Sequence, residues 1–223
     1  MKRILLFLSV LMLTQNYAQN KEYTVTLQEI LAERNRIKTS YTIANSEAKD
    51  SILKETRKYL FKTLVDDIFE YWYETPWDFN GHTTIPRKGK IACGYFVTTT
   101  LEDLGFAIPR FKWAQSASEV FIKKLAVDQV TRFTNKPVIV IENFLLEHGN
   151  GLYLVGLDDH TGFIVVKNKK VRFIHASYYK PEIGVMSEVL DSENPLKYSK
   201  YRVIGKLLSD TMVENWINTI RYY

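Results

Sequence analysis

The hydrophobic positions divide the chain into a helical first third and a strand-rich second half. Across residues 46–72 the apolar side chains recur at intervals of four and seven positions, which is the spacing of an amphipathic helix. These positions are Leu53, Leu60, Leu64, Ile68 and Trp72. Ser46 is the expected cap of this helix, and a shorter helical pattern covers residues 27–37. We expect residues 20–75 to form a helical segment that packs on a core made by the rest of the chain.

Short apolar runs, which are typical of strands, dominate the second half of the chain. They cover residues 138–141, 152–157, 162–166, 171–176 and 201–207. Helical patterns precede them at residues 93–104 and 116–125, and another at residues 210–220 ends the chain. Helices followed by antiparallel strands predict an α+β domain over residues 76–223.

The helix that carries the cysteine has well-marked ends. Residues 75–89 contain two prolines and two glycines, which break regular structure and predict a long ordered loop. The helical pattern then starts at Cys93 and ends at Leu104, because Gly105 supplies a C-terminal cap. Cys93 is therefore expected in the first turn, where unpaired backbone amides and the helix dipole favour a thiolate.

The N-terminus has the pattern of an export signal. Two basic residues precede an apolar stretch over residues 4–13 that is too short to cross a membrane, and a polar segment follows. We expect residues 1–19 to be removed after Ala18 or Gln19, and the mature protein to be periplasmic or extracellular, without a membrane span. Loss of the two basic residues lowers the formal net charge from +5 to +3.

The remaining charges are scattered along the chain rather than gathered in one basic segment. Aromatic residues do not alternate with the basic ones, as a surface that stacks on bases would require. We therefore expect no nucleic-acid partner. A weak attraction to an anionic polymer such as a cell wall is compatible with this charge. The sequence makes no prediction of oligomeric state.

The chain has one cysteine, Cys93, so it can form no internal disulfide. An isolated thiol in an oxidising compartment is a liability unless it is buried, paired between chains, or used in chemistry. A base must reach the thiol if it is used, and the chain offers four histidines. His82 and His148 lie in loop segments rich in glycine or proline, where a solvated ring is the expected role. His160 and His175 differ because they flank a predicted hairpin.

The hairpin places His160 and His175 on one face of a sheet. With Asn168 and Lys169 as its turn, Gly162 faces His175, and side chains two positions apart share a face. The two histidines are then diagonal neighbours about 7 Å apart at the backbone. We expect His160 to act as the base for the cysteine and His175 to orient the ring of His160.

The same residues do not predict a metal site. One cysteine and two histidines do not complete the tetrahedral ligand set of zinc, and a further ligand would have to come from Asp158 or Asp159. We therefore expect neither a metal nor another cofactor.

Four short motifs share their order and spacing with a known family. They are Ala92-Cys93-Gly94-Tyr95-Phe96-Val97, Gly105-Phe106 with Pro109-Arg110 and Gln115, His160-Thr161-Gly162-Phe163-Ile164, and Phe173-Ile174-His175-Ala176-Ser177. Over residues 76–208 the chain resembles the NlpC/P60-like branch of the papain-like cysteine peptidases. The resemblance implies a helix bearing the cysteine packed on an antiparallel sheet bearing the histidines. It also implies a Cys93, His160, His175 triad that hydrolyses amide bonds in cell-wall peptides.

The chain departs from that family beside the nucleophile. Members usually have aspartate before and serine after the cysteine, whereas Ala92 and Gly94 stand here. Tyr71 and Tyr73 are the candidates for the aromatic hydroxyl that often completes the oxyanion hole of the family.

The sequence thus predicts an exported cysteine hydrolase that acts on peptidoglycan-derived peptides. Backbone amides at the start of the Cys93 helix are expected to meet the developing negative charge. Two alternatives stay open: a catalytically inactive secreted binding protein with the same fold, and a thiol-dependent transacylase.

Overall fold

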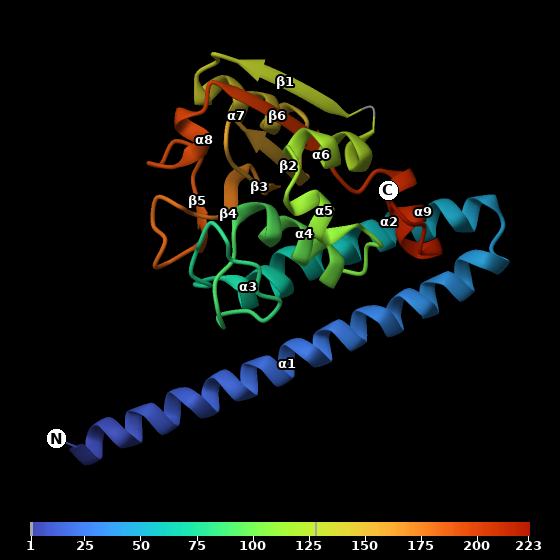
Figure 1. The fold of residues 1–223 in the computed structure, drawn as a ribbon. Coiled ribbons are helices and arrows are strands. Elements are labelled where there is room, and N and C mark those ends of the chain that lie inside the picture. Colours follow the sequence, from blue (N-terminus) through green and yellow to red (C-terminus); the bar gives the residue numbers. More distant parts are fainter. Residues whose placement is uncertain (1, 128) are drawn as a thin grey trace.

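The structure of the chain, a computed structural model, describes residues 2–127 and 129–223, with side chains from Glu22 onward (Figure 1). The helices are α1 (Lys2–Ile43), α2 (Ser46–Lys62), the π-helix η1 (Thr63–Ile68), α3 (Phe69–Trp72), α4 (Cys93–Asp103), α5 (Arg110–Ala114), α6 (Ser118–Ala126), α7 (Val138–Glu147), α8 (Pro195–Tyr198) and α9 (Asp210–Asn218). The strands are β1 (Val130–Thr134), β2 (Gly151–Leu157), β3 (Thr161–Lys167), β4 (Lys170–Ala176), β5 (Val185–Glu188) and β6 (Tyr201–Lys206).

The strands of the described residues form one antiparallel sheet in the order β1-β6-β2-β3-β4-β5, which confirms the predicted α+β class. The β3–β4 hairpin has the predicted register, with Phe163 opposite Ile174. Asn168 and Lys169 form its turn and both have positive φ, as a two-residue hairpin turn that matches the twist of the strands requires. The register that was expected to align the two histidines is therefore confirmed.

Helix α4 lies between the sheet and the N-terminal helices (Figure 1). The ring of Phe96 contacts Phe163 of β3 at a centroid distance of 6.0 Å and Phe69 of α3 at 5.9 Å. The five apolar positions predicted for residues 46–72 are all buried, and they share one hydrophobic core with α4 and the inner face of the sheet. Aromatic packing on both sides therefore fixes the helix that carries Cys93.

The start and end of α4 follow from its sequence. The helix begins at Cys93, as predicted. At its C-terminus the Gly105 amide donates to the Glu102 carbonyl at 2.8 Å, and the Phe106 amide donates to the Leu101 carbonyl at 3.0 Å. Gly105 has a φ of +97°, so this is a Schellman motif that requires glycine, and the predicted cap is confirmed.

Some sequence expectations are wrong. Residues 138–141 are not a strand but the first turn of α7, whose buried Ile141 and Leu145 are four positions apart. Their β-branched residues favoured a strand over a helix, and so short an apolar run does not separate the two. Strands β1 and β5 were not expected at all, and the helix expected at residues 27–37 extends to Ile43 in α1.

The N-terminal helices also differ from expectation in their ends. Asn45, rather than Ser46, caps α2, because its side chain accepts from the Ala48 amide at 2.9 Å. The leader expected over residues 1–19 lies outside the residues whose side chains the structure describes. No helix in the described part of the chain is long and apolar enough to cross a membrane.

Gly94 lies where α4 meets α5, and the contact leaves no room for a side chain. A Cβ atom built on Gly94 would lie 2.3 Å from the Ala114 carbonyl oxygen. Backbone cannot yield as a flexible side chain does, so the serine that the family usually carries here does not fit this packing.

We therefore expect Gly94→Ser to lower the free energy of unfolding by about 1–3 kcal/mol. Gly151→Ala is the matched control, because its Cβ would meet side-chain atoms and no backbone, namely Lys206 Cε at 3.1 Å and Tyr153 Cε2 at 3.6 Å. The control should change stability by less than about 0.5 kcal/mol. Urea denaturation measures both variants, and equal losses would show that the α4–α5 contact is not tight.

Candidate active site

A cleft of about 1100 Å³ opens at the N-terminal end of α4. It is lined by Cys93 from that helix and by His160, which precedes β3. Aromatic side chains form much of the wall: Trp77, Phe79, Tyr95, Phe111, Phe121, Tyr178 and Tyr201. The fold thus brings the predicted nucleophile and the predicted base to one cavity.

Cys93 is partly exposed in the first turn of α4. Burial of the sulfur raises the pKa of the thiol, and hydrogen bonds from backbone amides, first that of Thr161 and then that of Gly94, lower the pKa by less. The negative charge of Asp159 raises it further. The amides at the helix start favour the thiolate, as expected, but loss of hydration outweighs them and the net shift of the pKa is upward. At neutral pH the residue is a thiol that needs a base.

His160 and His175 are adjacent, as the hairpin register predicted. Nε2 of His160 lies 2.9 Å from Nδ1 of His175, and the two rings are nearly perpendicular, at 89°. Both side chains are buried, and burial lowers the pKa of each imidazole, with the pKa of His160 well below its ordinary value. Both rings are therefore neutral at pH 7.

The other ring nitrogen of His160, Nδ1, is buried and has no hydrogen-bond partner among the described residues. It therefore makes no hydrogen bond to the Cys93 sulfur in this structure. The amide of Thr161, the residue that follows His160, nevertheless lies close enough to the sulfur to lower its pKa, and both Cys93 and His160 line the cleft. Catalytic hydrogen bonds are often long or unformed before substrate binds.

Glu188 completes the hydrogen-bonded chain behind the histidines, and no sequence pattern predicted its role. One carboxylate oxygen, Oε2, lies 3.0 Å from Nε2 of His175, and the other, Oε1, accepts from Lys180 at 2.7 Å. Burial raises the pKa of Glu188, but the hydrogen bonds from His175 and Lys180 outweigh it, so the net shift is downward and the side chain is a carboxylate. Strand β5 places this residue beside β4.

Aromatic rings hold the two imidazoles in place. Phe173 stacks on His175 with a centroid distance of 4.1 Å and an interplanar angle of 13°. Tyr178 meets His160 edge-on at 5.2 Å and also contacts Trp77 at 5.9 Å. Neither ring can turn without displacing a packed neighbour, so the hydrogen-bonded orientation is fixed by packing as well.

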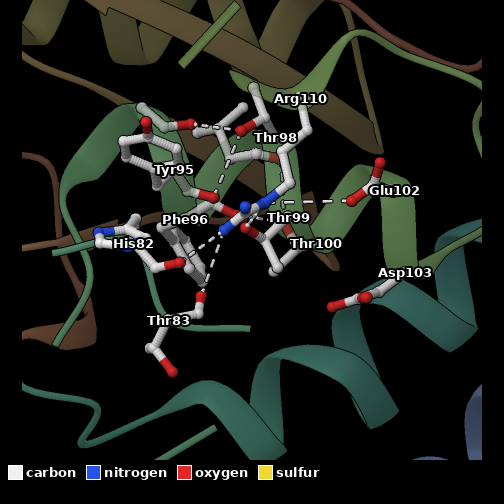
Figure 2. Close-up of polar contacts among 12 residues, drawn as sticks. His82, Thr83, Tyr95, Phe96, Thr98, Thr99, Thr100, Glu102, Asp103 and Arg110 are labelled. Carbon is white, nitrogen blue, oxygen red and sulfur yellow. Dashed lines mark hydrogen bonds and ion pairs between the residues drawn. The ribbon is translucent and has the colours of Figure 1, made fainter. Parts of the chain in front are cut away.

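Arg110 anchors the loop that forms one wall of the cleft (Figure 2). The guanidinium is buried and donates through Nε to Thr99 of α4 at 2.7 Å, and through Nη2 to the His82 carbonyl at 2.9 Å. It also lies 5.1 Å from the ring centre of Tyr95. His82 thereby lines the cleft, and its side chain is exposed, as expected of a solvated loop residue.

The charged residues among the described lining of the cleft are acidic, with no lysine or arginine. Glu119 pairs with Arg132, and Asp158 accepts from the backbone amides of residues 200 and 201. The third acidic residue, Asp159, accepts a hydrogen bond from the Tyr178 hydroxyl at 3.4 Å. In the described part of the chain, no group of three histidine, cysteine or acidic side chains is placed to hold a metal ion.

The two tyrosines expected near the oxyanion hole are not in the cleft. The Tyr71 hydroxyl lies 3.3 Å from the Thr26 hydroxyl, among the N-terminal helices, and Tyr73 lines a smaller cavity beside Ser187. That expectation is wrong because both residues precede the long loop and face away from its cleft side. Polar donors in the cleft come instead from the first turn of α4 and from Gln115, whose amide donates to the Tyr95 hydroxyl at 2.8 Å.

The raised pKa of Cys93 is tested by measuring, as a function of pH, the rate at which iodoacetamide alkylates its thiol. Only the thiolate reacts, so the midpoint of the rate profile should lie at higher pH in the folded protein than in the protein unfolded in urea. With one cysteine in the chain, both measurements report the same sulfur. A folded-state midpoint at or below the unfolded one would mean that the helix start prevails over burial.

Comparisons with known proteins assign the chain to no family. No family model, no curated protein and no solved structure matches it. The function of this cleft therefore has to be argued from its own geometry.

Proposed function

We propose that the protein is a cysteine hydrolase that cleaves amide bonds, with Cys93 as nucleophile and His160 as base. The observation that carries the proposal is the unpartnered Nδ1 of His160, buried in the cleft that holds the chain's one thiol. A ring nitrogen that makes no hydrogen bond within the protein, on an imidazole held through its other nitrogen by a second imidazole, is available to act as a general base.

The reaction starts from a neutral thiol and a neutral imidazole. Nδ1 of His160 takes the thiol proton as the Cys93 sulfur forms a bond to the carbonyl carbon of the substrate. Backbone amides in the first turn of α4 meet the negative charge that develops on the carbonyl oxygen. Collapse breaks the carbon–nitrogen bond, and the leaving amine takes the proton from His160. Water, deprotonated by His160, then hydrolyses the thioester and restores the thiol.

The fold that we propose is a papain-like core of the NlpC/P60 type. Its support is the packing of α4, which carries the cysteine at its start, against β3 and β4. The order of cysteine, first histidine and second histidine along the chain supports it further. On this proposal the N-terminal helices are an embellishment that shares the core of the catalytic domain.

Peptidoglycan-derived peptides are the proposed substrates, and the export-like N-terminus is the reason, because it would place the enzyme beside the cell wall. The acidic lining of the cleft favours a peptide segment that is uncharged or carries an amine over one rich in carboxylates. We expect the scissile bond to lie next to such a segment.

A catalytically inactive binding protein with the same cleft is the second candidate. The observation in its favour is the raised pKa of Cys93 together with the missing hydrogen bond to His160. Such a protein would bind peptides through its aromatic wall and release no product.

Replacement of the nucleophile or the base separates the two candidates. Cys93→Ala and His160→Ala should each lower the release of fragments from purified peptidoglycan to background, a loss of at least about 100-fold. His148→Ala is the matched control, since that ring is exposed and bound to the Phe144 carbonyl outside the cleft. Mass spectrometry of the released fragments is the measurement. Equal activity in Cys93→Ala and wild type would rule out the hydrolase.

His175→Gln should retain measurable activity. A glutamine side chain can accept from Nε2 of His160 through its oxygen and donate to Glu188 through its nitrogen, so both buried partners stay satisfied. We expect its kcat to fall less than that of His160→Ala. The opposite order in the same fragment assay would mean that His175 is the base.

A further inference from the structure

The protonation of His160 has two possible forms, and only one of them can act as the base. A neutral imidazole carries a hydrogen on one ring nitrogen and a lone pair on the other. Nδ1 of His160 accepts a proton only if the ring's hydrogen sits on Nε2. Some group in the structure must select that tautomer, because an isolated imidazole interconverts freely between the two.

The hydrogen bonds that select the tautomer of His160 start at Glu188 and run through His175. A carboxylate only accepts, so the 3.0 Å contact between Oε2 and Nε2 of His175 requires the hydrogen of His175 to be on Nε2. Nδ1 of His175 is then a lone pair. At 2.9 Å from that lone pair, Nε2 of His160 must carry a hydrogen, which leaves Nδ1 of His160 unprotonated.

The opposite pair of tautomers, with the hydrogen of each ring on Nδ1, is disfavoured by the groups around the two histidines. It would set the lone pair of His175 Nε2 against a carboxylate oxygen at 3.0 Å, with both side chains buried from water. Lys180, a pure donor, holds Oε1 of Glu188 and leaves Oε2 to His175. Each oxygen of the carboxylate therefore accepts from one protein donor, Oε1 from Lys180 and Oε2 from His175, and neither depends on solvent for a partner.

We propose that Glu188, held by Lys180, is a positioning residue that sets the tautomers of His175 and His160, so that Nδ1 of His160 faces the cleft without a hydrogen. The consequence for catalysis rests on the proposed function. The tautomers themselves are a property of the folded protein and need no substrate.

Glu188→Gln tests the proposal with almost no change in shape. The new amide has one oxygen and one NH2 group where the carboxylate had two oxygens. Lys180 can bind only the oxygen, which turns the NH2 group toward His175 and makes Nε2 of His175 an acceptor. The hydrogens of both histidines should then move to Nδ1, and the base in the cleft should be lost.

The measurement is the ring 15N spectrum of protein labelled at its four histidines, in which lone-pair and protonated nitrogens have well-separated shifts. His82→Gln and His148→Gln assign the two other rings. We expect Nε2–H on His160 and His175 in the wild type and Nδ1–H on both in Glu188→Gln. In Glu188→Gln with Lys180→Met, the amide can turn its oxygen to His175, and Nε2–H should return.

A second-site control uses Lys167, which pairs with Asp66 at the other end of β3. Glu188→Gln with Lys167→Met should keep the inverted tautomers. In the fragment assay, Glu188→Gln should lower kcat at least 100-fold. Adding Lys180→Met to Glu188→Gln should raise kcat again by at least 10-fold. A merely structural role for Glu188 predicts no such recovery, because the second substitution only removes another contact.

The proposal is overturned if wild-type His160 carries its hydrogen on Nδ1, or if Glu188→Gln keeps Nε2–H on both rings. It is also overturned if adding Lys180→Met to Glu188→Gln restores no more activity and no more Nε2–H than adding Lys167→Met does. A wild-type spectrum with the hydrogen of His160 on Nδ1 overturns the proposal even where a variant fails to fold. If the tautomers behave as expected and no substrate is cleaved, the hydrolase proposal fails and this inference stands.

Discussion

The register of the β3–β4 hairpin controls the whole site. Opposed residues in a sheet alternate between its faces, so a slip of one position would turn His175 to the face that packs on α4 and move Ile174 to the face that carries Phe173 and the second hydrophobic core. The observed register instead aligns a diagonal across three strands, from His160 before β3, through His175 on β4, to Glu188 on β5. The apolar residues on both faces stabilise that register, because a slip of one position would move each of them out of its own hydrophobic core and to the opposite face of the sheet.

Burial then sets the charge states of the thiol and of both imidazoles. It raises the pKa of Cys93 and lowers the pKa of both histidines, so the resting site holds a neutral thiol and neutral rings. A buried thiolate and imidazolium would need hydration that the cleft walls exclude. Only Glu188 keeps a charge, because Lys180 reaches it from a partly exposed position. The site therefore depends on a transfer of one proton during attack rather than on an ion pair formed in advance.

How far the sequence could predict this arrangement depends on the range of each interaction. The hairpin and the start of the Cys93 helix are local, set by a turn of Asn168 and Lys169 and by glycines and prolines, and both were predicted. Glu188 was missed because β5 has only four residues, Val185–Glu188, and no alternating pattern marks them as a strand. The pKa of Cys93 depends on residues brought in by the fold, so no local motif reports it.

Trp77 Nε1, Trp113 Nε1 and Ser177 Oγ are also buried without a partner among the described residues, but the unpartnered nitrogen of His160 differs because its ring is held through the other nitrogen, Nε2, by His175. A buried polar atom without a partner costs about 1–3 kcal/mol, and nearly all are paired by backbone, side chains or water. Here every other polar atom on the diagonal is satisfied: Nε2 of His160, both nitrogens of His175 and both oxygens of Glu188. The sixth, Nδ1 of His160, belongs to the cleft that also holds the Cys93 thiol. In the proposed mechanism, the proton of Cys93 is the group that this lone pair accepts.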